Sequence, residues 1–103
     1  MFVQGRVTNG TAYLTQVGQF EVDVAIEGKV LLVRQQDRPG LIAAVAQALA
    51  AEGVNVSFMT VGRMSKGEDA IMCIGVDTPP SGETLGAINK VEGIIECGLF
   101  GSQ

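Results

Sequence analysis

Two short polar segments of the sequence combine residue types that suit a free amino acid. The first is Asp37-Arg38-Pro39-Gly40, where an apolar run gives way to a helical pattern, and the second contains Asn55, just after that pattern. Backbone N–H groups at a helix start attract a carboxylate, and Asp37 can pair with an ammonium group. Asn55 offers both a donor and an acceptor. We expect these positions to meet at one edge of a β-α-β unit and to form an α-amino acid site.

A structural interpretation of the same residues stays open. Asp37 would then only cap the helix, and Asn55 would be only a turn residue after Gly53. Residue types alone do not separate these two interpretations.

The chain lacks the residues that most catalytic mechanisms use. The chain has no histidine, and its two cysteines, Cys73 and Cys97, both sit in apolar runs. These features argue against a histidine-based triad or a metal site and favour buried free thiols in a reducing compartment. The glycines form neither the dinucleotide pattern nor the phosphate-loop pattern. We therefore expect no catalytic residue, no metal and no cofactor in this chain, and do not expect it to be an enzyme by itself.

Composition narrows the class of partner. The net charge is -4, so the chain lacks the basic surface that binds nucleic acid. Hydrophobic residues make up 47% of the chain, but no apolar run approaches the roughly 20 residues of a membrane span. We expect a globular domain that contacts neither nucleic acid nor a membrane.

From residue 29 onward the pattern predicts β-α-β-β-α-β. The expected elements are a strand over 30–33, a helix over 38–52, strands over 54–64 and 70–76 joined by a turn at 65–68, a helix after Ser81 and a strand from Ile94. In the first helix Asp37 would be the cap, Pro39 would occupy the first turn and Gly53 would end it. The order predicts an α+β, ferredoxin-like fold, with a four-stranded antiparallel sheet and both helices on one face.

Two strands carry further expectations. The run 70–76 has almost no polar alternation, which is typical of a central strand or of one covered on both faces. The strand beginning at Lys29 would leave an unpaired apolar edge, so we expect two copies to pair through it together with the first helix.

The pattern of residues 1–28 predicts three short strands and no helix. Asn9-Gly10 predicts a hairpin turn, and alternation from Phe20 to Ile26 predicts a half-buried third strand. These strands contain too few large apolar residues to form a hydrophobic core of their own, so we expect them to be part of a larger structure.

Residues 36–42, 53–63 and 70–77 together resemble the ACT domain at the C-terminus of D-3-phosphoglycerate dehydrogenases, in particular the longer, multidomain form. Residues 5–28 resemble the tail of the intervening domain that precedes it. The resemblance implies a boundary between residues 1–28, the end of the intervening domain, and residues 29–103, the ACT domain. The catalytic domains and the NAD that they use would belong to the rest of such an enzyme.

The resemblance also implies a ligand and a location. ACT domains of this family pair into an eight-stranded sheet and bind L-serine, or a related small amino acid, between two copies. By position, the implied contacts are Gln35, Asp37, Asn55 and the turn residues Pro39, Gly40 and Leu41. Gln35 departs from the histidine or tyrosine that relatives often carry. The family implies a cytoplasmic protein, or one of the plastid stroma in a photosynthetic source.

Two functions therefore stay open for this chain. One is an allosteric regulatory domain that binds L-serine, and the other is an assembly module that joins subunits and binds no ligand.

Overall fold

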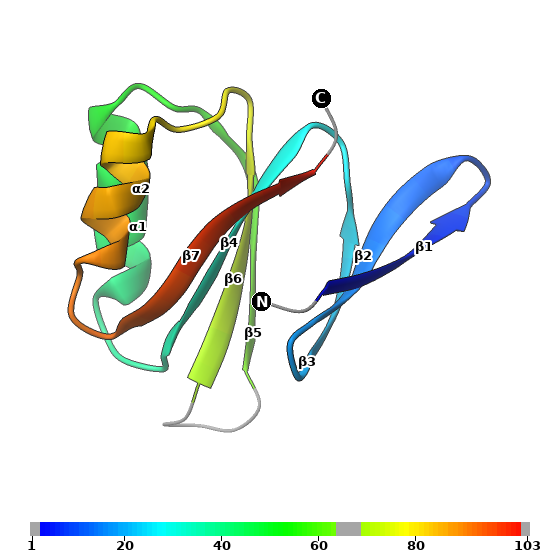
Figure 1. The fold of residues 1–103 in the computed structure, drawn as a ribbon, viewed down its shortest axis with the longest axis horizontal. Helices are drawn as coiled ribbons and strands as arrows, with labels where there is room; N and C mark the ends of the chain where they lie inside the picture. The colour runs from blue at the N-terminus through cyan, green and yellow to red at the C-terminus, as the bar shows by residue number, and fades with distance from the viewer. Residues whose placement is uncertain (1–2, 64–68, 102–103) are drawn as a thin grey trace.

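The computed structural model describes residues 3–63 and 69–101, which form two β-sheets and a pair of helices (Figure 1). The elements are β1 (Val3–Thr8), β2 (Thr11–Val17), β3 (Phe20–Ala25), β4 (Lys29–Gln36), α1 (Leu41–Ala51), β5 (Val56–Arg63), β6 (Asp69–Val76), α2 (Gly82–Asn89) and β7 (Ile94–Gly101). The turn expected at residues 65–68 lies outside the described residues. Within the described ranges, no helix has the length and apolar character needed to cross a membrane.

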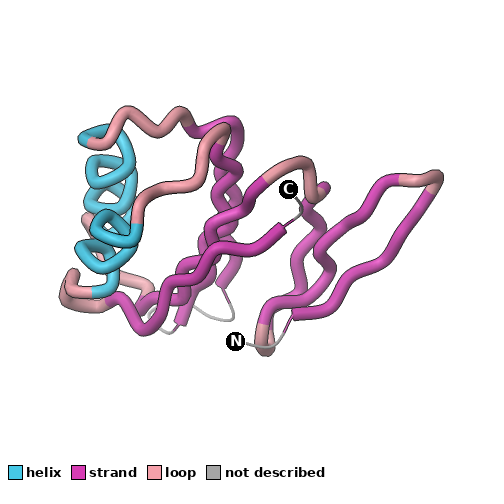
Figure 2. The backbone as a smooth tube through the Cα atoms, turned by 45° about the horizontal axis from the view of Figure 1, so that its top comes forward, coloured by secondary structure: helices cyan, strands magenta, loops and turns pink. Residues whose placement is uncertain are grey.

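The four-stranded sheet has the order β5-β6-β4-β7, and every neighbouring pair is antiparallel. Both helices cover one face of it, as Figure 2 shows. Leu31 and Val33 of β4 pack beneath them with Val45 and Leu49 of α1 and Ile88 of α2. The predicted α+β, ferredoxin-like arrangement is confirmed.

The expectation that the strand beginning at Lys29 is a free edge was wrong. β4 pairs with β6 along one side and with β7 along the other, so its apolar residues are central. In this topology the second crossover places β7 beyond β4, which leaves β5 and β7 as the two edges. Any sheet-to-sheet pairing between copies must use β5 or β7.

The second face of the four-stranded sheet is covered by the sheet β1-β2-β3 (Figure 1). The core between the sheets consists of Leu14, Val17, Phe20, Val24, Val30, Leu32, Ile71 and Cys73. β6 is therefore both central and buried on both faces, which explains its lack of polar alternation.

The N-terminal strands find their packing partner within this chain. Asn9 and Gly10 have φ values of 51° and 79°, so the predicted hairpin turn is confirmed. Leu14 and Val24 are 1% and 4% exposed against the four-stranded sheet. β1 lies farther out, and five of its six residues are exposed.

The first helix begins later than the sequence pattern predicted. Gly40 is its N-cap residue at φ 87° and makes no side-chain cap bond, so Asp37 does not occupy the N-cap position and Pro39 precedes the helix. A residue before proline avoids helical angles, and the left-handed Gly40 then interrupts them again. The end agrees with expectation, because Gly53 has φ 79° and the N–H groups of Gly53 and Val54 donate to Ala50 O and Leu49 O.

The second helix is capped by Ser81, as predicted. Its hydroxyl accepts from the Thr84 N–H at 3.2 Å, and the Ser81 N–H donates to Glu52 Oε1 at 2.9 Å. Glu52 follows α1, so its carboxylate ties the end of one helix to the start of the other. These bonds lower the pKa of Glu52, the backbone bond from Ser81 contributing most, followed by the side chains of Ser81 and Thr84.

Glu52→Gln is expected to lower the melting temperature near neutral pH and to lose this effect in acid. A lowered folded pKa means that the carboxylate stabilises the fold above its ordinary value of 4.5 and ceases to do so as pH falls through the folded value. Melting curves of both proteins between pH 3 and 7 measure this. Glu21→Gln, on an exposed residue of β3, is the control. A difference that stays constant down to pH 3 would contradict the assignment.

Candidate functional site

The deepest polar group among the predicted site residues is the side chain of Gln35. It lies near the end of β4 on the face that Leu31 and Val33 turn toward the helices, and it is 2% exposed. Its Oε1 atom is buried without a hydrogen-bond partner among the described residues. Leaving a buried acceptor unsatisfied costs about 1 to 3 kcal/mol, so Gln35 is suited to accept a hydrogen bond from a ligand.

The start of α1 adds donors at the same end of the sheet. The Ala44 N–H makes the first bond of the helical ladder, to Gly40 O at 3.0 Å. The N–H groups ahead of it have no partner within the helix, and the first turn contains no acidic residue. These donors and the positive end of the helix dipole favour a carboxylate.

The turn between β4 and α1 is held closely by the loop that precedes β7. The Gln36 N–H donates to Gly93 O at 2.8 Å, and Arg38 Nη1 donates to Gln36 Oε1 at 3.3 Å. Gly93 has φ 100°, a conformation that favours glycine, and a Cβ there would lie 2.9 Å from a methyl group of Leu41. Asp37 lies half-buried within the supported turn. The structure thus gathers Gln35, Asp37, Pro39, Gly40 and Leu41 at one end of the sheet.

Asn55 lies at the opposite end, which corrects the expectation that it meets Asp37 within one chain. Lys29 and Val56 both pair with Val76, so the start of β5 lies level with the start of β4. Asp37 follows the other end of β4, roughly 25 Å away at about 3.3 Å per strand residue. A site that contains both Asp37 and Asn55 needs two chains.

Asp77 is a residue of interest that the sequence analysis missed. Asn55 Nδ2 donates to Asp77 Oδ2 at 2.6 Å, and the Asp77 N–H donates to Asn55 O at 3.0 Å. The two residues are 22 positions apart, and only the β5–β6 register brings them together. No local sequence signal could have found this pair.

The β5 edge presents apolar surface at the end where the α1 turn lies. Ile42 in the first turn of α1 is 44% exposed, and Val61 near the end of β5 is 41% exposed. Met59 packs into the core under the helices, so Val61, two residues on, faces the same side. The residues Leu41–Ala51 include no charged side chain. This edge is suited to contact another protein surface.

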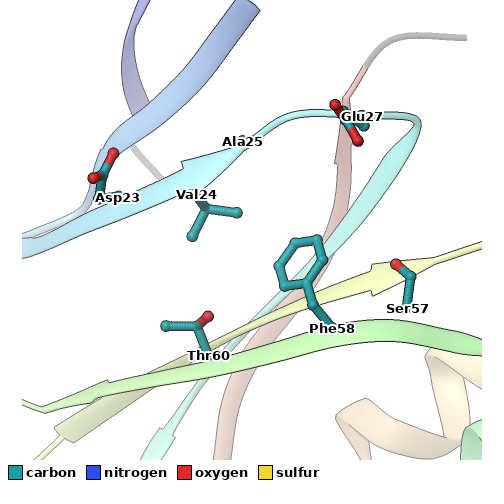
Figure 3. Close-up of a pocket in the computed structure, with 7 residues that line it drawn as sticks. All are labelled: Asp23, Val24, Ala25, Glu27, Ser57, Phe58 and Thr60. Carbon is teal, nitrogen blue, oxygen red and sulfur yellow. The ribbon is translucent and has the colours of Figure 1, made fainter.

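A separate hollow lies between β3 and β5, on the face away from the helices (Figure 3). It has a volume of about 360 Å³ and is lined by Asp23, Val24, Ala25, Glu27, Ser57, Phe58 and Thr60. Its charged side chains are both carboxylates, which disfavour an amino acid's carboxylate. The hollow is therefore a poor alternative to the α1 turn.

The cysteines offer no reactive group. Burial raises the pKa of both the Cys73 and the Cys97 thiol to about 11, so the nucleophilic thiolate is scarce at neutral pH. Cys73 belongs to the core between the sheets and Cys97 packs against the core under the helices, so they lie on opposite faces. Across residues 3–63 and 69–101, no group of three potential metal ligands occurs.

Comparison with known proteins gives the family. A family model described as "ACT domain" matches residues 29–93. D-3-phosphoglycerate dehydrogenase 3, chloroplastic, of Arabidopsis thaliana is 54% identical over 91% of this chain, which covers 16% of that protein. The probable L-serine dehydratase beta chain of Bacillus subtilis is 32% identical over 87% of this chain, which covers 41% of it. A solved ACT domain from the GTP pyrophosphokinase of Chlorobium tepidum aligns over 70% of this chain and 95% of its own, at a TM-score of 0.49 and 10% identity.

Proposed function

Because the chain belongs to the ACT domain family, we propose that it is the L-serine-binding regulatory part of a D-3-phosphoglycerate dehydrogenase. The chain spans between 15% and 19% of the D-3-phosphoglycerate dehydrogenases that it matches. NAD-dependent oxidation would then be performed by domains outside the 103 residues. The chloroplastic relatives support the plastid stroma as the location.

The observation that supports a ligand most directly is the buried Oε1 of Gln35, which has no hydrogen-bond partner among the described residues. It lies at the same end of the sheet as the start of α1, where the N-cap residue Gly40 makes no side-chain cap bond. One group is an acceptor and the other a set of donors, so together they match a small molecule that carries both kinds of polar group. An assembly module would need neither feature. L-serine is our choice because of the family resemblance and because one relative is a probable L-serine dehydratase chain.

The second half of the site comes from another copy of the chain. Ala70 pairs with both Arg63 and Gln35, so the ends of β5 and β4 lie level with each other. If two chains pair antiparallel along β5, the partner's β5 begins where this chain's β5 ends. That arrangement carries the partner's Asn55 toward the turn at Asp37. Pairing along β7 would leave Asn55 at the far edge of the sheet.

The assembly module remains the second candidate function. The exposed Val61 on the edge strand β5 and the exposed Ile42 in the first turn of α1 favour it, because pairing of copies at this end of the sheet would bury apolar surface whether or not a ligand binds. Calorimetric titration of the chain with L-serine, glycine and L-alanine separates the two functions. Saturable binding that is tightest for L-serine supports a regulatory domain, whereas a dimer that releases no heat with any of the three supports assembly alone.

Asn55→Ala is expected to weaken L-serine binding by about 10-fold or more, because a hydrogen bond to a charged group contributes about 1.5 to 3 kcal/mol. Asn55 is exposed and caps neither helix, so the melting temperature should change little. Titration and thermal melting of the same samples provide both readouts. Gln19→Ala, at an exposed amide in the β2–β3 turn, is the matched control. Unchanged affinity in Asn55→Ala would exclude this residue from the site.

A further inference from the structure

Two hydrogen bonds join Asn55 to Asp77, one donated by the Asn55 side chain and one accepted by its backbone carbonyl. Its Nδ2 donates to Asp77 Oδ2 at 2.6 Å, a short bond to a carboxylate acceptor, and the Asp77 N–H donates to Asn55 O at 3.0 Å. Both residues are exposed beyond the paired ends of β5 and β6. The backbone bond holds the two residues side by side, and the side-chain bond then fixes how the amide is turned.

The direction of the side-chain bond determines which atom of Asn55 faces outward. The oxygen and nitrogen of an amide are nearly alike in shape, so their assignment must come from the hydrogen-bond network. An ionised carboxylate only accepts hydrogen bonds, so Nδ2 has to face Asp77. Oδ1, on the other side of the same planar group, therefore points away from Asp77 and is offered as an acceptor.

We infer that Asp77 is a positioning residue that makes Asn55 select the ammonium group of the amino acid bound by the partner chain. This inference rests on the proposed function. The acceptor Oδ1 and the negative charge of Asp77 behind it both favour a cationic donor. An ammonium group has three N–H donors, enough for Asn55 Oδ1 and for the partner's Asp37 together. The carboxylate of the ligand then faces the start of α1 in that partner.

The test compares L-serine with L-glycerate, which carries a hydroxyl where serine carries the ammonium group. We expect the wild-type chain to bind L-serine at least about 10-fold more tightly than L-glycerate, because the ammonium bonds are charge-assisted. Asp77→Asn removes the charge and lets the Asn55 amide turn over, so this ratio should fall to within about 3-fold. Glu21→Gln, which removes an exposed carboxylate from β3, should leave the ratio unchanged.

A purely structural role for Asp77 would give a different result. Loss of packing at the sheet end would weaken both ligands equally, and equal losses in Asp77→Asn would overturn the selection of the ammonium group. The NMR signals of the Asn55 side-chain amide, recorded without ligand, provide an independent readout. One Nδ2 proton should resonate downfield and exchange slowly with solvent in the wild type, and the two protons should become similar in Asp77→Asn.

These readouts also separate this inference from the proposed function. If the wild type binds neither compound while the Asn55 amide shows the expected signals, the proposed function fails, and with it the selection of an ammonium group. If the wild type binds L-serine but the Asn55 amide signals do not respond to Asp77→Asn, the function stands and Asp77 has no positioning role.

Discussion

Gly75→Ala is expected to lower the free energy of unfolding by about 1 to 3 kcal/mol, a large share of the stability of a domain of this size. Gly75 lies in the buried strand β6, opposite Phe58 of β5. A Cβ there would overlap the Phe58 ring and lie 2.6 Å from Ser57 Oγ. The ring would have to leave its place against the core between the two sheets, where it packs beside Cys73 and its neighbours.

Chemical denaturation of the two proteins measures this effect, and a matched glycine is available as the control. Gly98 lies in the edge strand β7, and a Cβ at that position meets nothing within 4 Å. Gly98→Ala should therefore change stability far less. Phe58→Leu combined with Gly75→Ala should cost less than the sum of the two single changes, because the smaller side chain removes the overlap. A fully stable Gly75→Ala protein would mean that Phe58 is not held against β6.

The features that could be predicted from sequence depend on neighbouring residues. Asn9-Gly10 sets its own hairpin turn, Ser81 caps α2 through Thr84 three residues on, and Gly53 ends α1 through bonds to Ala50 and Leu49. Each requires only a few adjacent dihedral angles. The β-α-β-β-α-β order follows from such local signals added together, which is why the fold was predictable.

The predictions were wrong where the structure depends on contacts between segments that are far apart in the sequence. Whether β4 is an edge depends on where β7 returns to the sheet, about 60 residues later, and the apolar run in β4 suits either position. Asn55 follows α1 closely in sequence, yet the helix carries the chain back to the opposite end of the sheet. The carboxylate that orients Asn55 comes from Asp77, on a strand that the local pattern does not connect to it. For this reason the sequence predicted residue types that suit an amino acid, but residue spacing alone wrongly placed Asp37 and Asn55 together within one chain. The family resemblance, by contrast, implied a site between two copies.

The start of α1 is an intermediate case. The helical pattern predicted a start near residue 38, whereas Pro39 and Gly40 both disfavour helical angles just before or at their own positions. In the structure the helix starts after them, at Leu41. The N-cap position is therefore held by Gly40, a residue that has no side chain with which to bond the first N–H groups of α1.

Mixing Asp37→Ala chains with Asn55→Ala chains is expected to restore the wild-type affinity for L-serine that neither variant shows alone. Asp37 and Asn55 lie at opposite ends of one sheet, so each proposed site takes one of them from each copy. In a mixed dimer one site receives both intact residues and the other receives both alanines. Random exchange of subunits makes half of the dimers mixed, so roughly a quarter of all sites should bind serine with wild-type affinity.

Unfolding the two variants together, refolding them and titrating with L-serine measures the fraction of restored sites. Asp37→Ala mixed with Gln35→Ala is the matched control, because both residues belong to the same half of the site and no mixed dimer regains an intact one. Restoration in the first mixture alone would establish a site shared between copies. If both mixtures stay inactive although the separate variants fold and pair, Asn55 and Asp37 do not share a ligand. The partner's contribution would then have to be sought at another residue near the α1 turn.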